Sequence, residues 1–124
     1  MGARMSHLPI NFKDKLSLVS EHWSPKVIAE MNGYHFKVVK IQGEFIWHDH
    51  KDTDEVFIVL DGAMRIYLTD GHVDLSAGEM YVVPRGTKHK PFAEKEAQVL
   101  LIEPKGVVNT GEEESSLKAN EVWL

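Results

Sequence analysis

Short hydrophobic runs separated by polar turn residues make up most of this chain. Between residues 34 and 42, Phe36 and Val38 fall on one side of an extended chain while Val39 and Ile41 fall on the other, which is the period of a β-strand. Comparable runs follow, and no stretch keeps the period of a long helix. The predicted strands cover residues 26–30, 34–42, 44–48, 55–60, 63–69, 72–75, 80–83, 89–93 and 97–103. This pattern predicts an all-β, antiparallel sandwich or barrel.

The two ends of the chain differ from the strand region. In residues 11–20, Phe12, Leu16 and Val19 have the spacing of one face of a short helix. Beyond the last predicted strand, residues 112–116 are polar and typical of a tail, although the final residues are apolar enough to dock. We therefore predict one domain with two extensions: an N-terminal arm (residues 1–33), a barrel (34–104) and a C-terminal tail (105–124).

Composition narrows the class of protein. The 124 residues include 43% hydrophobic and 27% charged side chains, which is typical of one globular domain. Basic residues are scattered and the formal net charge is −5, so we expect no nucleic-acid partner. No run approaches the length of a membrane helix, and residues 1–9 lack the apolar core of a secretory signal. Because cysteine is absent, disulfides and thiolate metal sites are excluded, and we expect a cytoplasmic protein.

Three histidines and one glutamate carry candidate metal chemistry. His48 and His50 are two residues apart at the end of a predicted strand, so both imidazoles project from the same face. Glu55 opens the next predicted strand, and His89 begins a later one that must close the other side of a barrel. Three neutral imidazoles and a carboxylate suit Mn, Fe, Co, Ni or Zn and leave coordination positions free for water or substrate. A lone histidine in a strand is more often a surface or hydrogen-bonded residue, so the residues alone leave this assignment open.

Two motifs in this region resemble those of the cupin superfamily. The first, residues 43–62, reads GEFIWHDHKDTDEVFIVLDG, and the second, residues 78–89, reads GEMYVVPRGTKH. Two positions depart from the family pattern. Only four residues separate Gly43 from His48, where the family usually has five, and Ala93 replaces a frequent asparagine. Neither departure removes a ligand.

The resemblance implies a small antiparallel cupin β-barrel, or jelly roll, that holds one divalent transition-metal ion. The implied ligands are His48, His50, Glu55 and His89, and the implied metals are Zn, Mn, Fe or Ni. Proteins of this superfamily include dioxygenases, isomerases, decarboxylases and lyases, and also binding or sensing proteins without catalysis. We therefore predict a metal-dependent enzyme acting on a small oxygen-rich metabolite, such as a keto acid, a diketone or a sugar derivative. The alternative is a non-catalytic module that binds or senses a small ligand.

Candidates for moving a proton at this site are few, and no catalytic residue is assigned from the sequence. The candidates are His35, Lys37, Tyr67 and Tyr81. His35 and Lys37 share one face of a predicted strand, but both faces of that strand mix polar and apolar groups. The inward face therefore cannot be identified from the pattern. For each candidate the alternative is a solvated strand face.

Apolar residues lie on both faces of the strands around the site. Phe57 and Val59 share a face with Glu55, and Ile46 shares one with His48. The opposite faces are apolar as well, at Phe45, Trp47, Val56, Ile58 and Leu60. A small barrel wetted on its outside would carry polar residues there, so we expect a homodimer that buries this face. The alternative is that the residues before position 34 fold back over it.

Overall fold

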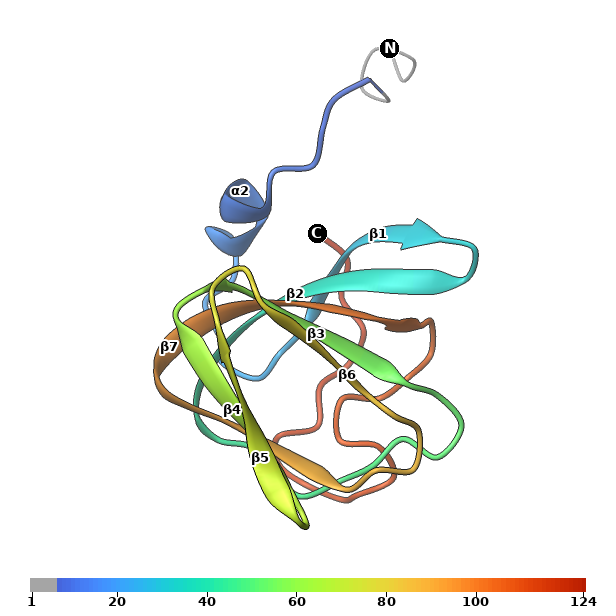
Figure 1. Ribbon diagram of the computed structural model, residues 1–124. Coiled ribbons are helices and arrows are strands. Elements are labelled where there is room, and N and C mark those ends of the chain that lie inside the picture. Colours follow the sequence, from blue (N-terminus) through green and yellow to red (C-terminus); the bar gives the residue numbers. More distant parts are fainter. Residues whose placement is uncertain (1–6) are drawn as a thin grey trace.

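Within residues 7–124, which the computed structural model describes, seven β-strands wrap around one interior (Figure 1). The strands pair antiparallel throughout, which confirms the predicted all-β barrel. The elements are α2 (Phe12–Leu16), β1 (Lys26–Met31), β2 (Tyr34–Glu44), β3 (Glu55–Asp61), β4 (Ala63–Leu68), β5 (Gly71–Ser76), β6 (Met80–Val83) and β7 (His89–Pro104).

Strand β7 joins the two sides of the barrel. It pairs with β2 along most of its length, with β3 through its later residues and with β4 through its first residues. The sheet β1-β2-β7-β3-β6 therefore continues into the β4–β5 hairpin. The sequence pattern predicts two strands here, at residues 89–93 and 97–103, and this is wrong because both belong to β7. The polar run at residues 94–96, which is exposed, has the composition of a turn between two strands. In the structure they lie opposite the register shift between Ile41 and Gly43 of β2.

The barrel interior is filled by inward-facing side chains of neighbouring strands. Phe57 and Val59 of β3 pack against Val39 and Ile41 of β2 and Val99 of β7, and all five are buried. The alternation predicted for β2 and β3 is therefore present, and it shows which face is inward. Burial of large apolar side chains contributes about 1.5–3 kcal/mol each, so this cluster is a main source of stability.

The short N-terminal helix begins with a capping interaction. The side chain of Asn11 accepts a hydrogen bond from the backbone N–H of Asp14 at 2.9 Å. The helix ends at Leu16 and does not continue through the predicted residues 11–20. The hydroxyl of Ser17 donates to the carbonyl of Asp14 at 2.6 Å, a local bond that competes with continued helix.

The segment before β1 covers part of the outer face of the sheet. Leu16 and Val19 pack against Val38 of β2 and Leu100 of β7, and Leu60 adjoins the same cluster. The fold-back predicted as an alternative to a dimer therefore exists for this part of the face. Figure 1 shows residues 7–11, just before α2, extending away from the barrel.

The C-terminal segment, residues 105–124, packs along the barrel (Figure 1). The backbone N–H of Val27 in β1 donates to the carbonyl of Val122 at 2.8 Å, and the N–H of Leu124 donates to the carbonyl of Val27 at 2.9 Å. Gly111 lies directly against the backbone of Asp49. The end of the chain thus adds a bridge to the free edge of β1 and touches the loop between two predicted metal ligands.

Residues 1–6 lie outside the described residues, and with them most of the segment in which we predict no secretory signal. Among residues 7–124, no helix has the length and apolar character needed to cross a membrane.

Candidate metal centre

The four predicted metal ligands come together inside the barrel. Glu55 is the first residue of β3 and His89 the first of β7, while His48 and His50 lie on the irregular segment that follows β2. All four are buried, and one ligand atom from each lies within 4.8 Å of the others. Because metal–donor distances are about 2 Å, a single ion fits between atoms grouped this closely.

Backbone hydrogen bonds fix the segment that carries His48 and His50 to the chain around His89. The N–H of His48 donates to the carbonyl of His89 at 3.0 Å, and the N–H of His89 donates back at 2.9 Å. The N–H of Gly86 donates to the carbonyl of His50 at 2.8 Å, and its φ of 73° favours glycine at that turn. Ligands far apart in the sequence are therefore held side by side before any ion binds.

The strand predicted over residues 44–48 is wrong, because β2 continues to Glu44 and ends there, just after the register shift and the positive φ at Gly43. The alternation is interrupted there, and Ile46, which we predict to share a face with His48, is half-buried and does not line the cavity beside it. Phe45 turns inward instead, with its ring centroid 5.2 Å from that of His48. Trp47 points to the surface and is 41% exposed.

Carbonyl groups set the orientation of two imidazoles. Nδ1 of His48 lies 2.9 Å from the carbonyl oxygen of Ile46, and Nδ1 of His89 lies 2.8 Å from that of Thr87. A carbonyl oxygen only accepts, so each Nδ1 carries the proton and donates it. Each Nε2 then presents its lone pair to the centre of the group, which is the form that a metal ion binds.

The donor atoms around Glu55 lack hydrogen-bond partners of their own. Its Oε1 lies 3.3 Å from Nε2 of His50 and 3.4 Å from Nε2 of His89. All three atoms are buried, and none makes a hydrogen bond of acceptable geometry within the described residues. Buried polar atoms are nearly always satisfied in native proteins. A divalent ion bound between these atoms fits the chemistry of the donor set and would satisfy the three atoms that lack hydrogen-bond partners.

The electrostatics of the group favour ionised Glu55 beside an uncharged His48. Burial alone favours the neutral carboxyl, but the His50 and His89 imidazoles close to its Oε1 outweigh burial and hold the pKa of Glu55 well below its usual range. Burial and the neighbouring His89 lower the pKa of His48 to about 4. Burial also acts against the charged form of His50, but the Glu55 carboxylate has the larger effect and raises the pKa of His50.

The candidates for proton transfer do not line the cavity beside the ligands in the part of the chain that the structure describes. His35 and Lys37 point into the barrel from β2 and are almost fully buried. Tyr81 packs against the inner core. Tyr67 alternates with the buried Ile66 and lies on the outside of the barrel.

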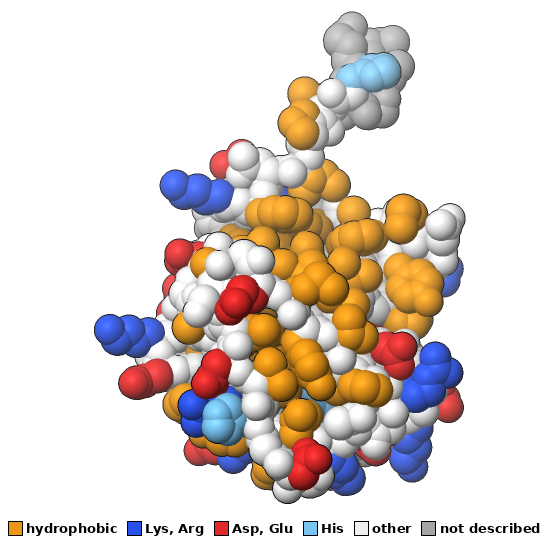
Figure 2. All heavy atoms as spheres, viewed as in Figure 1, with side chains coloured by type: hydrophobic (Ala, Val, Ile, Leu, Met, Phe, Trp, Pro, Cys, Tyr) orange, Lys and Arg blue, Asp and Glu red, His pale blue; other side chains and the backbone are white. Residues whose placement is uncertain are grey.

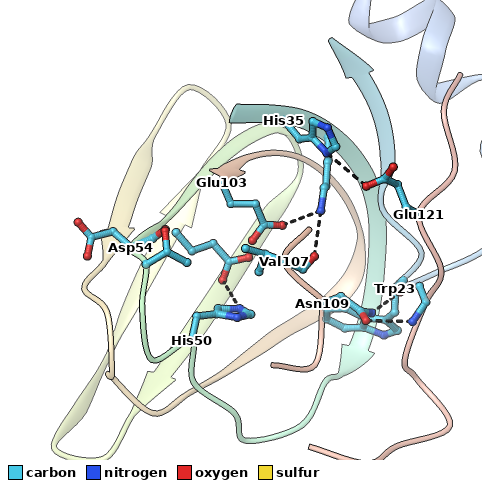
Figure 3. Close-up of polar contacts among 12 residues, drawn as sticks. Trp23, His35, His50, Asp54, Glu103, Val107, Asn109 and Glu121 are labelled. Atoms are coloured by element: carbon cyan, nitrogen blue, oxygen red, sulfur yellow. Dashed lines mark hydrogen bonds and ion pairs between the residues drawn. The ribbon is translucent and has the colours of Figure 1, made fainter. Parts of the chain in front are cut away.

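Glu103 is a buried acid that sequence reasoning missed. It follows Ile102, which pairs with Val56, so it lies beside Glu55 on the inner face. Its Oε1 accepts a hydrogen bond from Nζ of Lys37 at 3.1 Å (Figure 3), while its Oε2 has no partner among residues 7–124. Burial and the nearby Glu55 carboxylate raise the pKa of Glu103 to about 8. The one signal in the sequence is its place in the inward alternation of β7.

A comparison with protein-family models matches residues 35–105 to the cupin domain. The chain belongs to the cupin family. The match covers both motifs, and it extends from β2 to the residue after β7. The family resemblance indicated by the motifs is therefore confirmed.

Three proteins are similar to this cupin in sequence, and two of them have solved structures with the same fold. It is 58% identical to a cupin-2 domain containing protein from Shewanella frigidimarina, with a TM-score of 0.77 over 77% of this chain and 94% of that one. It is 34% identical to protein NMB1881 from Neisseria meningitidis, with a TM-score of 0.72 over 79% of this chain and 100% of that one. Uncharacterized protein YdbB from Bacillus subtilis is 38% identical over 64 residues, 51% of this chain and 57% of that protein. The match thus spans little more than half of YdbB, and none of these names states an activity.

Proposed function

We propose that this cupin binds one divalent transition-metal ion through His48, His50, Glu55 and His89 and acts with it on a small oxygen-bearing molecule. The observation that carries the proposal is the set of buried donor atoms without partners, on Glu55, His50 and His89. Each such atom costs about 1–3 kcal/mol if it stays unsatisfied. Zn, Mn, Fe and Ni are the proposed metals, because imidazole and carboxylate donors suit them.

The number of protein donors defines the chemistry that is available. An ion that accepts six ligands and takes four from the protein keeps two neighbouring positions open. These positions suit a substrate that binds through two oxygens, or one substrate oxygen beside O₂. Dioxygenation is the reaction class expected with iron, and isomerisation, decarboxylation or elimination with zinc, manganese or nickel. The residues of the chain hold the ion, orient the substrate and exclude water from around it.

Binding without turnover is the second candidate function. It is favoured by the positions of His35, Lys37, Tyr67 and Tyr81, since none of them lines the cavity beside the ligands. An enzyme of the isomerase or lyase type needs a group within hydrogen-bond reach of the proton that it moves. A sensor needs only affinity and a change of shape or stability.

Separate reconstitution with Fe, Mn, Ni and Zn distinguishes the two functions. Apo-protein loaded with each metal is incubated with a panel of keto acids, diketones and sugar derivatives, and substrate loss is followed by mass spectrometry. The enzyme proposal expects turnover with at least one metal and none with a His48→Ala variant. Ligand-dependent melting shifts without product in all four forms would instead support the sensor.

We propose that a second copy of this chain packs against the apolar surface that the N-terminal segment leaves exposed. Figure 2 shows hydrophobic side chains gathered over the face of β3 and β6. Met80 and Val82 of β6 are 58% and 40% exposed, and they pair with Ile58 and Val56 of β3. Of the face predicted from the sequence, Phe45 is interior, so the proposed dimer buries β6 together with β3.

The dimer is tested by light scattering after gel filtration. At micromolar concentration the wild-type chain should have the mass of two copies, and the double variant Met80→Glu/Val82→Glu should have the mass of one, because each partner would bury two unpaired charges. Thr69→Glu adds a charge at an exposed position elsewhere and should leave the mass unchanged. A wild-type monomer would contradict the proposal.

The cytoplasm is the proposed location, since a chain without cysteine has no need of an oxidising compartment.

A further inference from the structure

The cavity beside the proposed metal ligands has an almost wholly apolar wall. Twelve residues line it, and nine of them are aromatic, aliphatic or proline residues. The three polar ones are His48, Glu55 and Asn109. No lysine or arginine of the described chain is among them, so the wall has no cation to pair with a phosphate or with a carboxylate away from the metal.

The polar groups of the wall outside the metal site are already used. Nδ2 of Asn109 donates to the carbonyls of Trp23 at 3.2 Å and Leu117 at 2.9 Å, and its Oδ1 accepts from the N–H of Ala119 at 2.9 Å. The indole N–H of Trp23 donates to the carbonyl of Gln42 at 3.0 Å. A molecule in the cavity therefore finds polar contacts only at the metal site.

Trp23 is held in the wall at a conformational cost. Its φ is 60°, a left-handed value that is rare for a bulky residue. Its backbone N–H donates to the carbonyl of Lys40 at 2.9 Å, and its ring stacks on Phe45 with centroids 4.8 Å apart and planes at 27°. Backbone strain of this kind persists where the surroundings enforce it, and it clusters at ligand sites. The stacked pair of Trp23 and Phe45 thus forms a flat, rigid wall that begins beside the His48 imidazole.

We infer that the ligand of this cupin is a small molecule with a flat or compact apolar body and an oxygen pair at one end, of the β-diketone or catechol type. The inference rests on the proposed metal function, because the oxygens take the open positions on the ion. The body then lies against Trp23 and Phe45. Sugar derivatives and phosphorylated metabolites are poor fits, because each hydroxyl buried without a partner lowers affinity by about an order of magnitude.

Two probes with the same chelating skeleton test this. Acetylacetone and malonate both present O–C–C–C–O to an ion, but malonate carries charged oxygens where acetylacetone carries methyl groups. The metal content of nickel-loaded protein is measured first, because nickel accepts six ligands. Both probes and the polyhydroxylated dihydroxyacetone are then titrated by calorimetry. Acetylacetone should bind at least about tenfold more tightly than either competitor.

Variants of the flat wall complete the test. Trp23→Ala should weaken acetylacetone binding about tenfold and change malonate binding by less than about twofold. Phe45→Leu is a second variant with the same expected result, for use if Trp23→Ala folds poorly. Trp47→Ala removes a tryptophan of the surface and should change neither. The inference about the ligand would be overturned if metal-loaded protein bound malonate or dihydroxyacetone more tightly than acetylacetone. It would also be overturned if neither wall variant changed the affinity for acetylacetone. Neither result would contradict the proposed metal function. Failure of the wild type to load any of the four proposed metals would overturn the metal function as well.

Discussion

Replacing His89 by alanine is expected to leave the purified protein without its metal ion. His89 is fully buried and brings an imidazole from β7 to the segment that carries His48 and His50. Its loss leaves three donors, and we expect affinity to fall by more than about 100-fold, since even changes behind the ligands commonly cost 10- to 100-fold. Elemental analysis of freshly purified protein should give about one equivalent of metal per wild-type chain and a small fraction of that in the variant.

The same change should lower thermal stability through the lost ion. An ion at a thousand times its dissociation constant stabilises the folded state by about 4 kcal/mol, which for a domain of this size is on the order of 15 °C in Tm. A chelator should lower the Tm of the wild type by that amount and leave the variant unchanged. His72→Ala, at a half-exposed position on β5, is the control and should keep its metal. Full metal retention by both His48→Ala and His89→Ala would contradict the assignment of the ligands.

Gly111→Ala is expected to destabilise the protein and weaken metal binding together. A Cβ at this position would lie 2.2 Å from the carbonyl oxygen of Asp49, and the φ of 64° is unfavourable for alanine. The backbone of the loop between His48 and His50 must then move. We expect a loss of about 2–4 kcal/mol in the free energy of unfolding, from strain and overpacking combined, together with reduced metal content.

Gly106→Ala is a control that separates the effect of backbone strain from the effect of the contact between a Cβ and a neighbouring backbone. Gly106 has a similar φ of 88°, but a Cβ there meets no atom within 4 Å. Its substitution should cost about 1–2 kcal/mol in urea denaturation and leave metal content unchanged. Equal effects of the two alanines would show that contact with the Asp49 backbone does not position the ligand loop.

Much of the fold could be predicted from the sequence, because a strand with one buried face has alternating apolar and polar residues. The strand at residues 80–83 has the predicted bounds, and the inward set of β3 is the predicted one. The cluster of four candidate ligands was also predictable, since two motifs fix the spacing of glycines, histidines and glutamate. These signals are local, or they repeat a pattern shared by a family.

The features that sequence reasoning missed depend on contacts between distant segments. Phe45 faces inward because β2 breaks beside a positive-φ glycine, so alternation fails for the very residues before His48. Trp23 lies outside every predicted strand, and its position depends on bonds to β2 and to Asn109. Glu103 carries no motif at all. In each case the side chain is ordinary in the sequence, and its surroundings give it a role.

The cavity wall draws on both extensions of the chain, and this bears on how such proteins diverge. Trp23 precedes, and Asn109 follows, the region of residues 35–105 that matches the cupin domain, yet both line the cavity beside the metal group. Substitutions at these two positions alter the shape of the cavity without replacing any of the four ligands. Selection for a new substrate therefore has a route that does not pass through the metal centre. Two cupins can carry the same histidine and glutamate motifs and still choose different molecules.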